Sequence, residues 1–261
     1  MKKVLSFLIL SLSILSAGNA QWQRSSNGLY GGLVNTLAID PTTNYLYAAV
    51  YQNGVFLSTN NGNSWTQSLI SDEVFYALAT SGIYTYAGAT DQGVYLTTNN
   101  GINWIQTSLN NNSIYALAAN GSYVFAGTNA GMYRSTDYGS NWTKITPYFQ
   151  NSSVYSIAIN GNNIFAGADY SVFLSTNNGM SWVTTSLNVN GYVRALAVNG
   201  INVFAGKDAF GLYLSTNNGT SWTQTSLNYL DVYALDTLGN YLFAGTNNYL
   251  SDSGGVKLTS N

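Results

Sequence analysis

The 261-residue sequence is poor in charge: 8 basic and 10 acidic residues make up 7% of the chain, against about a quarter in ordinary globular proteins. It contains no histidine and no cysteine, which excludes disulfides and removes the commonest general base and metal ligand. No stretch concentrates basic residues, so the composition argues against nucleic acid as a partner.

The first 20 residues have the pattern of a secretory signal peptide. Lys2 and Lys3 precede an apolar run over residues 4–15, and small residues follow up to Ala20, where cleavage is expected. The run is too short for a permanent membrane span. We therefore expect residues 1–20 to be removed and residues 21–261 to be exported, to the periplasm or the cell exterior, without membrane insertion. The mature chain has 6 basic and 10 acidic residues and a formal net charge of −4.

The rest of the chain is repetitive. It opens with QWQRSSNG around Trp22, and a 12-residue segment then recurs five times, at residues 54–65, 93–104, 131–142, 171–182 and 211–222. The tryptophans that end these segments are 39, 38, 40 and 40 residues apart. A fixed period of this length indicates an array of supersecondary units that cover one another's apolar faces.

Each repeat predicts four short strands, here named A to D in chain order. In residues 113–146 four runs rich in Val, Ile, Tyr, Phe and Thr are separated by Asn-Gly, Gly-x and Asx turns, as in an antiparallel meander. Strand B carries a pair of small residues at one fixed place in every repeat, which indicates close approach of neighbouring sheets. These pairs are Ala48-Ala49, Ala87-Gly88, Ala126-Gly127, Ala166-Gly167, Ala205-Gly206 and Ala244-Gly245.

The period and the strand count predict an all-β fold, a β-propeller of four-stranded antiparallel blades in a single domain. The mature chain begins with a lone strand D, and its last repeat reaches only strand C. We therefore expect six blades, with residues 21–27 closing the ring, because closure removes exposed sheet edges. The alternative is that the protein continues beyond Asn261 and has a further blade.

The repeated hairpin follows the pattern S/T-x-D/N-x-G-x-x-W, most fully at Ser135, Asp137, Gly139 and Trp142. This pattern resembles the Asp-box, or BNR, repeat of sialidase-like propellers, which also occurs in oligoxyloglucan-type glycosidases, sortilin ectodomains and photosystem II assembly factors. The resemblance covers nearly the whole mature chain and implies the propeller architecture. Enzymes and non-enzymes share that architecture, so it implies no single function. In related propellers the box turns lie on the face away from the ligand.

The opposite face is therefore expected to carry the B-to-C and D-to-A connections. Seven of the ten acidic residues fall there, together with several tyrosines, and such a mixture suits a sugar or a peptide. The acidic residues are Asp72, Glu73, Asp91, Asp169, Asp208, Asp231 and Asp252. The simpler interpretation is that loops carry the solubilising residues of any protein.

A non-catalytic binding module is the favoured interpretation, with a glycoside hydrolase of sialidase-like type as the alternative. A glycosidase needs two carboxylates at a defined separation, yet Glu73 is the only glutamate and the spacing singles out no partner for it. The three arginines, Arg24, Arg134 and Arg194, fall in different blades and strands, unlike a carboxylate-binding cluster. We expect no catalytic residue, metal or cofactor, and a monomer that binds a glycan or a protein.

The candidate ligand site lies at the start of strand A, which lines the channel in a propeller. The second position of this strand is assigned to Asn35, Phe75, Tyr115, Tyr155, Arg194 and Tyr233. Glu73 and Asp231 lie just before the strand in their own blades. The hypothesis is a polar pocket of Asn35, Glu73, Arg194 and Asp231 on an aromatic floor, which binds a small polar or anionic group. The alternative is that these aromatics only pack between blades.

Overall fold

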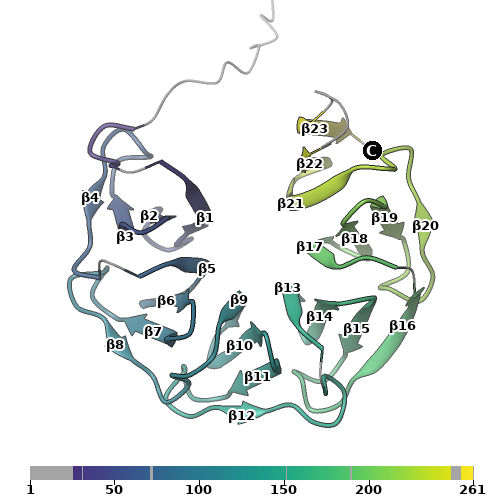
Figure 1. The fold of residues 1–261 in the computed structure, drawn as a ribbon, viewed down its shortest axis with the longest axis horizontal. Helices are drawn as coiled ribbons and strands as arrows, with labels where there is room; N and C mark the ends of the chain where they lie inside the picture. The colour runs from purple at the N-terminus through teal and green to yellow at the C-terminus, as the bar shows by residue number, and fades with distance from the viewer. Residues whose placement is uncertain are drawn as a thin grey trace, which may run out of the picture.

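The fold is a β-propeller. The computed structural model describes residues 26–30, 32–70, 73–150, 152–188, 190–247 and 254–260. Throughout these ranges the regular structure is β-strand, and 23 strands form six antiparallel sheets, arranged as blades around a central axis (Figure 1). The predicted all-β, six-bladed propeller is confirmed. The described residues include no helix that is long and apolar enough to span a membrane.

Successive strands pair with their neighbours in each blade, from the inner to the outer edge. Blade 1 contains β1 (Val34–Ile39), β2 (Leu46–Val50), β3 (Gly54–Ser58) and β4 (Thr66–Gln67). Blade 2 contains β5 (Phe75–Ser81), β6 (Tyr84–Ala89), β7 (Gly93–Thr97) and β8 (Ile105–Gln106). Blade 3 contains β9 (Ile114–Asn120), β10 (Tyr123–Thr128), β11 (Gly131–Ser135) and β12 (Thr143–Lys144). Blade 4 contains β13 (Val154–Asn160), β14 (Asn163–Ala168), β15 (Ser171–Ser175) and β16 (Val183–Asn188). Blade 5 contains β17 (Val193–Asn199), β18 (Asn202–Lys207), β19 (Gly211–Ser215) and β20 (Thr223–Gln224). Blade 6 contains β21 (Asp231–Leu238), β22 (Tyr241–Asn247) and β23 (Gly255–Ser260).

The repeated turn between the third and fourth strands is held by side chains. In blade 3 the Ser135 hydroxyl donates to Asp137 Oδ1 at 2.7 Å and accepts from the Gly139 amide at 2.8 Å. Asp137 in turn accepts from the Asn141 amide at 2.9 Å. Tyr138 and Gly139 both have positive φ, 58° and 86°, which explains the glycine at this position. A Ser or Thr with an Asn makes the same contacts in the other four turns.

Neighbouring blades approach most closely at the small pair of the second strand. A Cβ atom added to Gly127 would lie 2.6 Å from the carbonyl oxygen of Val154 in the next blade, and one on Gly206 would lie 2.5 Å from a Val232 methyl. The same position of Gly88 faces Ile114, and that of Gly167 faces Val193. The expected close approach is confirmed, because no side chain fits between these sheets.

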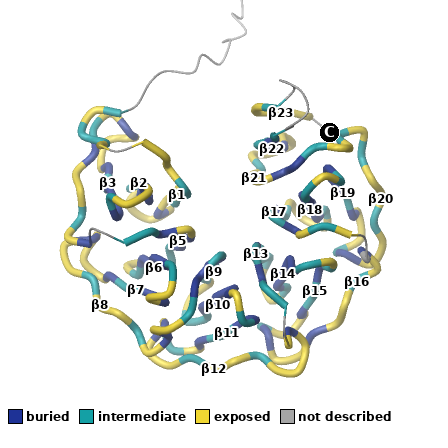
Figure 2. The backbone as a smooth tube through the Cα atoms, in the orientation of Figure 1, coloured by how far each residue is buried: buried dark blue, intermediate teal, exposed yellow. Residues whose placement is uncertain are grey.

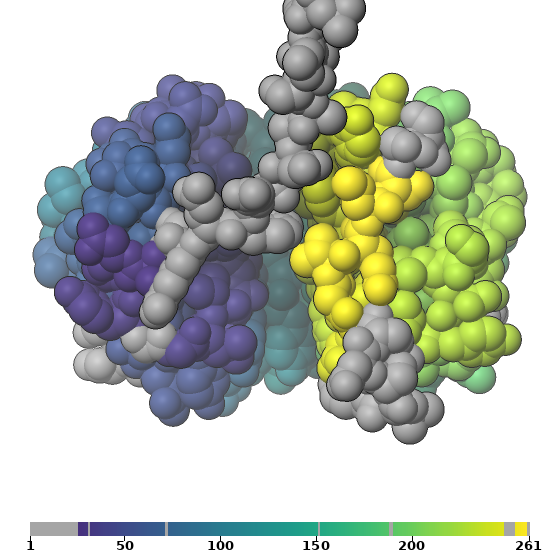
Figure 3. All heavy atoms as spheres, turned by 90° about the horizontal axis from the view of Figure 1, so that it is seen from above, coloured from purple at the N-terminus to yellow at the C-terminus, as the bar shows by residue number. Residues whose placement is uncertain are grey.

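The first and last blades do not meet in the same way. β1 contacts β5, and each later inner strand contacts the next as far as β21, but no comparable contact joins β1 and β21. Figure 2 shows that much of β1 is exposed, and Figure 3 shows the two end blades facing each other as separate masses. The expected signal peptide, residues 1–20, and most of the expected closing strand, residues 21–25, lie outside the described residues. Beyond them, Asn27 accepts from the Trp65 amide of blade 1 at 2.8 Å, and Leu29 packs on the same blade.

Candidate ligand-binding site at the channel mouth

The site is built by a β-bulge at the start of every inner strand. Pairing with the second strand skips one residue in each blade, as between Val154 and Ser156 or between Val193 and Ala195. A bulge places an extra residue opposite a single partner and changes the direction of its side chain. The skipped residues, in blade order, are Asn35, Tyr76, Tyr115, Tyr155, Arg194 and Tyr233.

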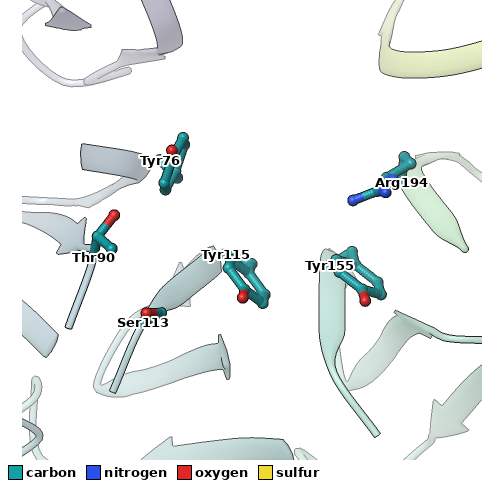
Figure 4. A pocket seen from close by; sticks show the side chains of 6 residues that line it. All are labelled: Tyr76, Thr90, Ser113, Tyr115, Tyr155 and Arg194. Carbon is teal, nitrogen blue, oxygen red and sulfur yellow. The ribbon is translucent and has the colours of Figure 1, made fainter. Parts of the chain in front are cut away.

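Four of these six side chains surround one cavity. The cavity has a volume of about 490 Å³ and is lined by Tyr76, Thr90, Ser113, Tyr115, Tyr155 and Arg194. Figure 4 shows Tyr76 and Arg194 on opposite sides of it, with Tyr115 and Tyr155 between them. A cavity of this size is within the range of small-ligand sites.

Aromatic rings form a continuous arc through blades 3 to 5. The rings of Tyr115 and Tyr155 stack with centroids 5.5 Å apart, and those of Tyr155 and Tyr192 are 5.1 Å apart. The Arg194 guanidinium lies 4.8 Å from the centroids of both Tyr155 and Tyr192. Both contacts are within the range of cation–π interactions, which favour a guanidinium beside aromatic rings.

Arg194 is paired with a carboxylate of its own blade. Its Nε donates to both carboxylate oxygens of Asp208, at 3.0 and 2.9 Å, and a terminal nitrogen lies 2.9 Å from Oδ2. Burial by itself would lower the arginine pKa, but the hydrogen bond and the charge of Asp208 outweigh it and raise that pKa. Arg194 is therefore positively charged, and the carboxylate of Asp208 both fixes its position and balances its charge.

Tyr155 has a corresponding partner in blade 4. Its hydroxyl donates to Asp169 Oδ1 at 3.2 Å. The pKa of Tyr155 is raised chiefly by burial, and the negative charge of Asp169 adds to the effect. The mouth thus contains the carboxylates of Asp169 and Asp208 together with the single guanidinium of Arg194.

The structure corrects the assignment of Phe75. This side chain is fully buried in the core between blades 1 and 2, where it contacts Tyr95 edge-on at 5.9 Å. Tyr76, the next residue, occupies the bulge and lines the cavity. Phe75 corresponds instead to Ile114, the buried first residue of β9.

Asn35, Glu73 and Asp231 do not line the cavity with Arg194. Asn35 donates across the blade boundary to the Phe75 carbonyl at 3.0 Å. Glu73 lies near Tyr95, whose pKa is raised mainly by burial and further by the glutamate charge. Asp231 accepts from the amide of Ala209, a residue with φ of 59°, at 2.6 Å, and so stabilises a loop of blade 5. Of the four polar residues in the sequence-based hypothesis, the described cavity lining includes Arg194.

Tyr233 takes the bulge position of blade 6 but does not line this cavity. It is close enough to Arg194 for its hydroxyl to contribute to the raised arginine pKa. Its side chain is 44% exposed. Tyr233 belongs to β21 and Asn35 to β1, and these are the inner strands of the two end blades (Figure 1).

Several contributors to the site escaped the sequence analysis, among them the lining residues Tyr76, Thr90 and Ser113, and Asp208 as the partner of Arg194. A usable signal existed, because Tyr155 and Asp169 are separated by 14 residues, and so are Arg194 and Asp208. Residue 14 after Tyr76 is Thr90. Among the described residues no group of three or more potential ligands could hold a metal ion. Asp72 and Asp252, which the sequence places on this face, lie outside the described residues.

No protein-family model matches the chain, and no curated protein sequence matches it. Its fold is similar to that of the extracellular domain of a B. thetaiotaomicron protein described as a hybrid two-component system, with a TM-score of 0.69 and 19% identity over 86% of this chain and 32% of that one. It is also similar to a GH74 xyloglucanase from Xanthomonas campestris (TM-score 0.72, 14% identity, 87% and 45% of the two chains) and to the computationally designed protein Ika8 (TM-score 0.67, 16% identity, 87% and 71%). The chain spans about a third of the first of these and under half of the second. At such identities the likeness shows the fold alone.

Proposed function

We propose that the protein is an exported, non-catalytic binding propeller of the Asp-box type, and that it holds a neutral saccharide at the channel mouth. The observation that carries this is the cavity of about 490 Å³ lined by Tyr76, Tyr115, Tyr155 and Arg194. Tyrosine rings offer flat apolar faces for the CH groups of a sugar, and their hydroxyls offer hydrogen bonds at the edges.

The arginine and its partner support a neutral ligand. Because Asp208 already accepts from two guanidinium nitrogens, an anion would gain little there and would also meet Asp169. The pair instead presents donors and acceptors side by side, which suits adjacent hydroxyl groups. This argument disfavours sialic acid and acidic peptides, which the sequence left open as ligands.

A hydrolase is the less supported alternative. Retaining and inverting glycosidases need two carboxyl groups that flank the scissile bond. Among the described residues that line the cavity there is no carboxylate, and Asp208 beside it is held by Arg194. Asp231 accepts from the backbone amide of Ala209 and Glu73 lies near Tyr95, and neither is among the described residues that line the cavity.

Titration of neutral oligosaccharides by calorimetry tests the proposal. Arg194→Ala and Tyr115→Ala are each expected to weaken binding at least about tenfold, since each removes one wall of the cavity. Arg134→Ala is the matched control: that arginine donates to the Asn178 carbonyl at the repeated turns, and binding should be unchanged. If only sialylated glycans or acidic peptides bind, the ligand class is wrong. Turnover of a glycoside that Glu73→Gln abolishes would establish the hydrolase instead.

A further inference from the structure

The cavity at the channel mouth carries its charge on one side. Among the described residues that line it, Arg194 is the only charged one. Figure 4 shows a nitrogen of its guanidinium directed into the cavity. An arginine in such a position commonly binds a carboxylate, sulfate or phosphate group of a ligand. The charge of the saccharide that this site accepts therefore depends on what the guanidinium already contacts.

Asp208 contacts the guanidinium in the way that an acidic ligand would. Arg194 Nε lies 3.0 and 2.9 Å from the two carboxylate oxygens, and a terminal nitrogen lies 2.9 Å from Oδ2. The side chains of Arg194 and Asp208 are 32% and 22% exposed, so most of the pair is shielded from water, which strengthens its attraction. A carboxylate of the protein itself thus occupies the place of a ligand carboxylate.

The backbone places the two partners beside each other. Val193 pairs with Lys207 across β17 and β18, and Arg194 and Asp208 are the residues that follow the members of this pair. The Asp208 amide also donates to the Tyr192 carbonyl at 3.1 Å. Because both partners stand on one ladder of the same blade, their pairing avoids the entropy cost of binding that a free acidic ligand meets.

A carboxylate at this position is not a requirement of the repeat. The equivalent residue, 14 positions after the bulge residue, is neutral in three other blades: Thr90 in blade 2, Asn129 in blade 3 and Asn247 in blade 6. Blade 4 has Asp169, which accepts from the hydroxyl of Tyr155. The pairing of a carboxylate with a cation at the mouth is therefore a feature of blade 5, where the bulge residue is Arg194.

We propose that Asp208 is the specificity-determining residue of this site, and that by pairing with Arg194 it makes the site select neutral over acidic saccharides. The inference rests on the proposed function, because it concerns which saccharides the same cavity accepts. Asp208 contacts Nε and one terminal nitrogen, so the other terminal nitrogen can donate to a sugar hydroxyl. An acidic group at the same place meets the carboxylate of Asp208 and is repelled by it.

Titration calorimetry of charge variants tests this assignment. The probes are methyl glucoside, glucuronate, which adds one carboxylate, and inorganic sulfate, which needs no saccharide contact. Asp208→Asn keeps the size of the side chain and releases the guanidinium. It should increase the affinities for glucuronate and sulfate at least about tenfold over wild type, because a charge-assisted contact replaces a repulsion. The double variant Arg194→Ala with Asp208→Asn should lose this gain.

Two further variants separate the pairing from general effects of charge. Asp137→Asn removes a carboxylate from the repeated turn of blade 3, where the other four turns already have asparagine, and should bind both anions as the wild type does. Asp169→Asn removes a carboxylate from the mouth and leaves the pair of Arg194 and Asp208 intact, so its gain should be much smaller. An equal gain in Asp169→Asn would assign the selectivity to the overall charge of the mouth and overturn the proposal.

Loss of folding must be separated from the effect on binding, because Asp208 also lies near the buried ammonium of Lys207. The melting temperature of each variant provides this control. Lys207→Met combined with Asp208→Asn removes the ammonium together with the carboxylate, and it should show the same gain in anion binding. The two proposals fail separately. A wild type that binds no neutral saccharide would refute the proposed function, whereas folded Asp208→Asn proteins without a gain for sulfate or glucuronate would refute the role of Asp208.

Discussion

At the scale of single residues, Lys207 is the least expected feature of the fold. Its side chain is fully buried at the end of β18, and its ammonium donates to the Tyr170 carbonyl at 3.1 Å. Burial lowers the pKa of Lys207 to about 8, although the nearby charge of Asp208 acts in the opposite direction. The equivalent positions in blades 2 and 4 are Ala89 and Ala168, so the repeat gives no reason to expect a lysine here.

This lysine predicts a stability that rises with pH. Its pKa is about 10.5 in the unfolded chain and about 8 in the fold, so the unfolded state binds more protons between these values. The free energy of unfolding should therefore increase by about 1 kcal/mol from pH 7 to pH 9, measured by urea titration. Lys207→Met should abolish the increase, whereas Lys144→Met, at an exposed position, should retain it. An increase that survives in Lys207→Met would assign the effect to another group.

The residues of the candidate site show which parts of a site one sequence can predict. Tyr115, Tyr155 and Arg194 were predicted because the second position of the inner strand is countable from the repeat. The repeat does not distinguish Phe75 from Tyr76, because both are aromatic and its spacing slips by one residue there. Only the bulge decides between them, and a bulge is a property of pairing, which a linear pattern does not contain.

At the scale of elements, the repeated turn explains why asparagine replaces aspartate in four of five copies. In each copy, Oδ1 of the Asp or Asn side chain accepts the same hydrogen bonds. What the other terminal atom of that side chain contacts, Oδ2 in Asp or Nδ2 in Asn, depends on the residue four positions later. Asp137 Oδ2 accepts from the side-chain amide of Asn141 at 2.7 Å. This hydrogen bond, together with the one from the backbone amide of Asn141, lowers the pKa of Asp137. Asn177 and Asn217 instead donate to the hydroxyls of Ser181 and Ser221.

Asn99→Asp should therefore leave the melting temperature nearly unchanged at pH 7. Asn99 accepts from the Thr97 hydroxyl and from the Asn103 backbone amide. Asn103 corresponds to Asn141, which donates to Asp137 in blade 3. Trp182→Ala is the contrasting change at the same element, with an expected loss of about 3–5 kcal/mol, because this indole is buried between blades 3 and 4. Trp104 is less buried and should lose less. A large loss in Asn99→Asp would show that the turn excludes charge.

At the scale of the whole molecule, the sequence predicted the architecture because the period, the four strands and the small pairs are properties of each unit. Contacts between blades could be predicted only where both contacting positions are part of the repeat, as for Gly127 and Val154. The arrangement of the first blade against the last occurs only once in the chain, so the repeat cannot predict it. Its evidence is instead the apolar surface left on β1 and β23, where every equivalent surface is covered.

Paired glycine substitutions measure whether that surface is covered in solution. Gly206→Ala should cost about 1–3 kcal/mol, because the added methyl would lie within 2.5 Å of Val232 and force two blades apart. Gly245→Ala meets nothing closer than 3.4 Å, an Ala234 methyl in its own blade, so an open ring predicts almost no loss. A closed ring brings Val34 to the position of Val232 and predicts a loss comparable to that of Gly206→Ala. Thermal and urea unfolding of the two variants, compared with wild type, therefore distinguish the two rings, and a Gly245→Ala protein that unfolds like wild type would show that blade 6 has no neighbour at that face.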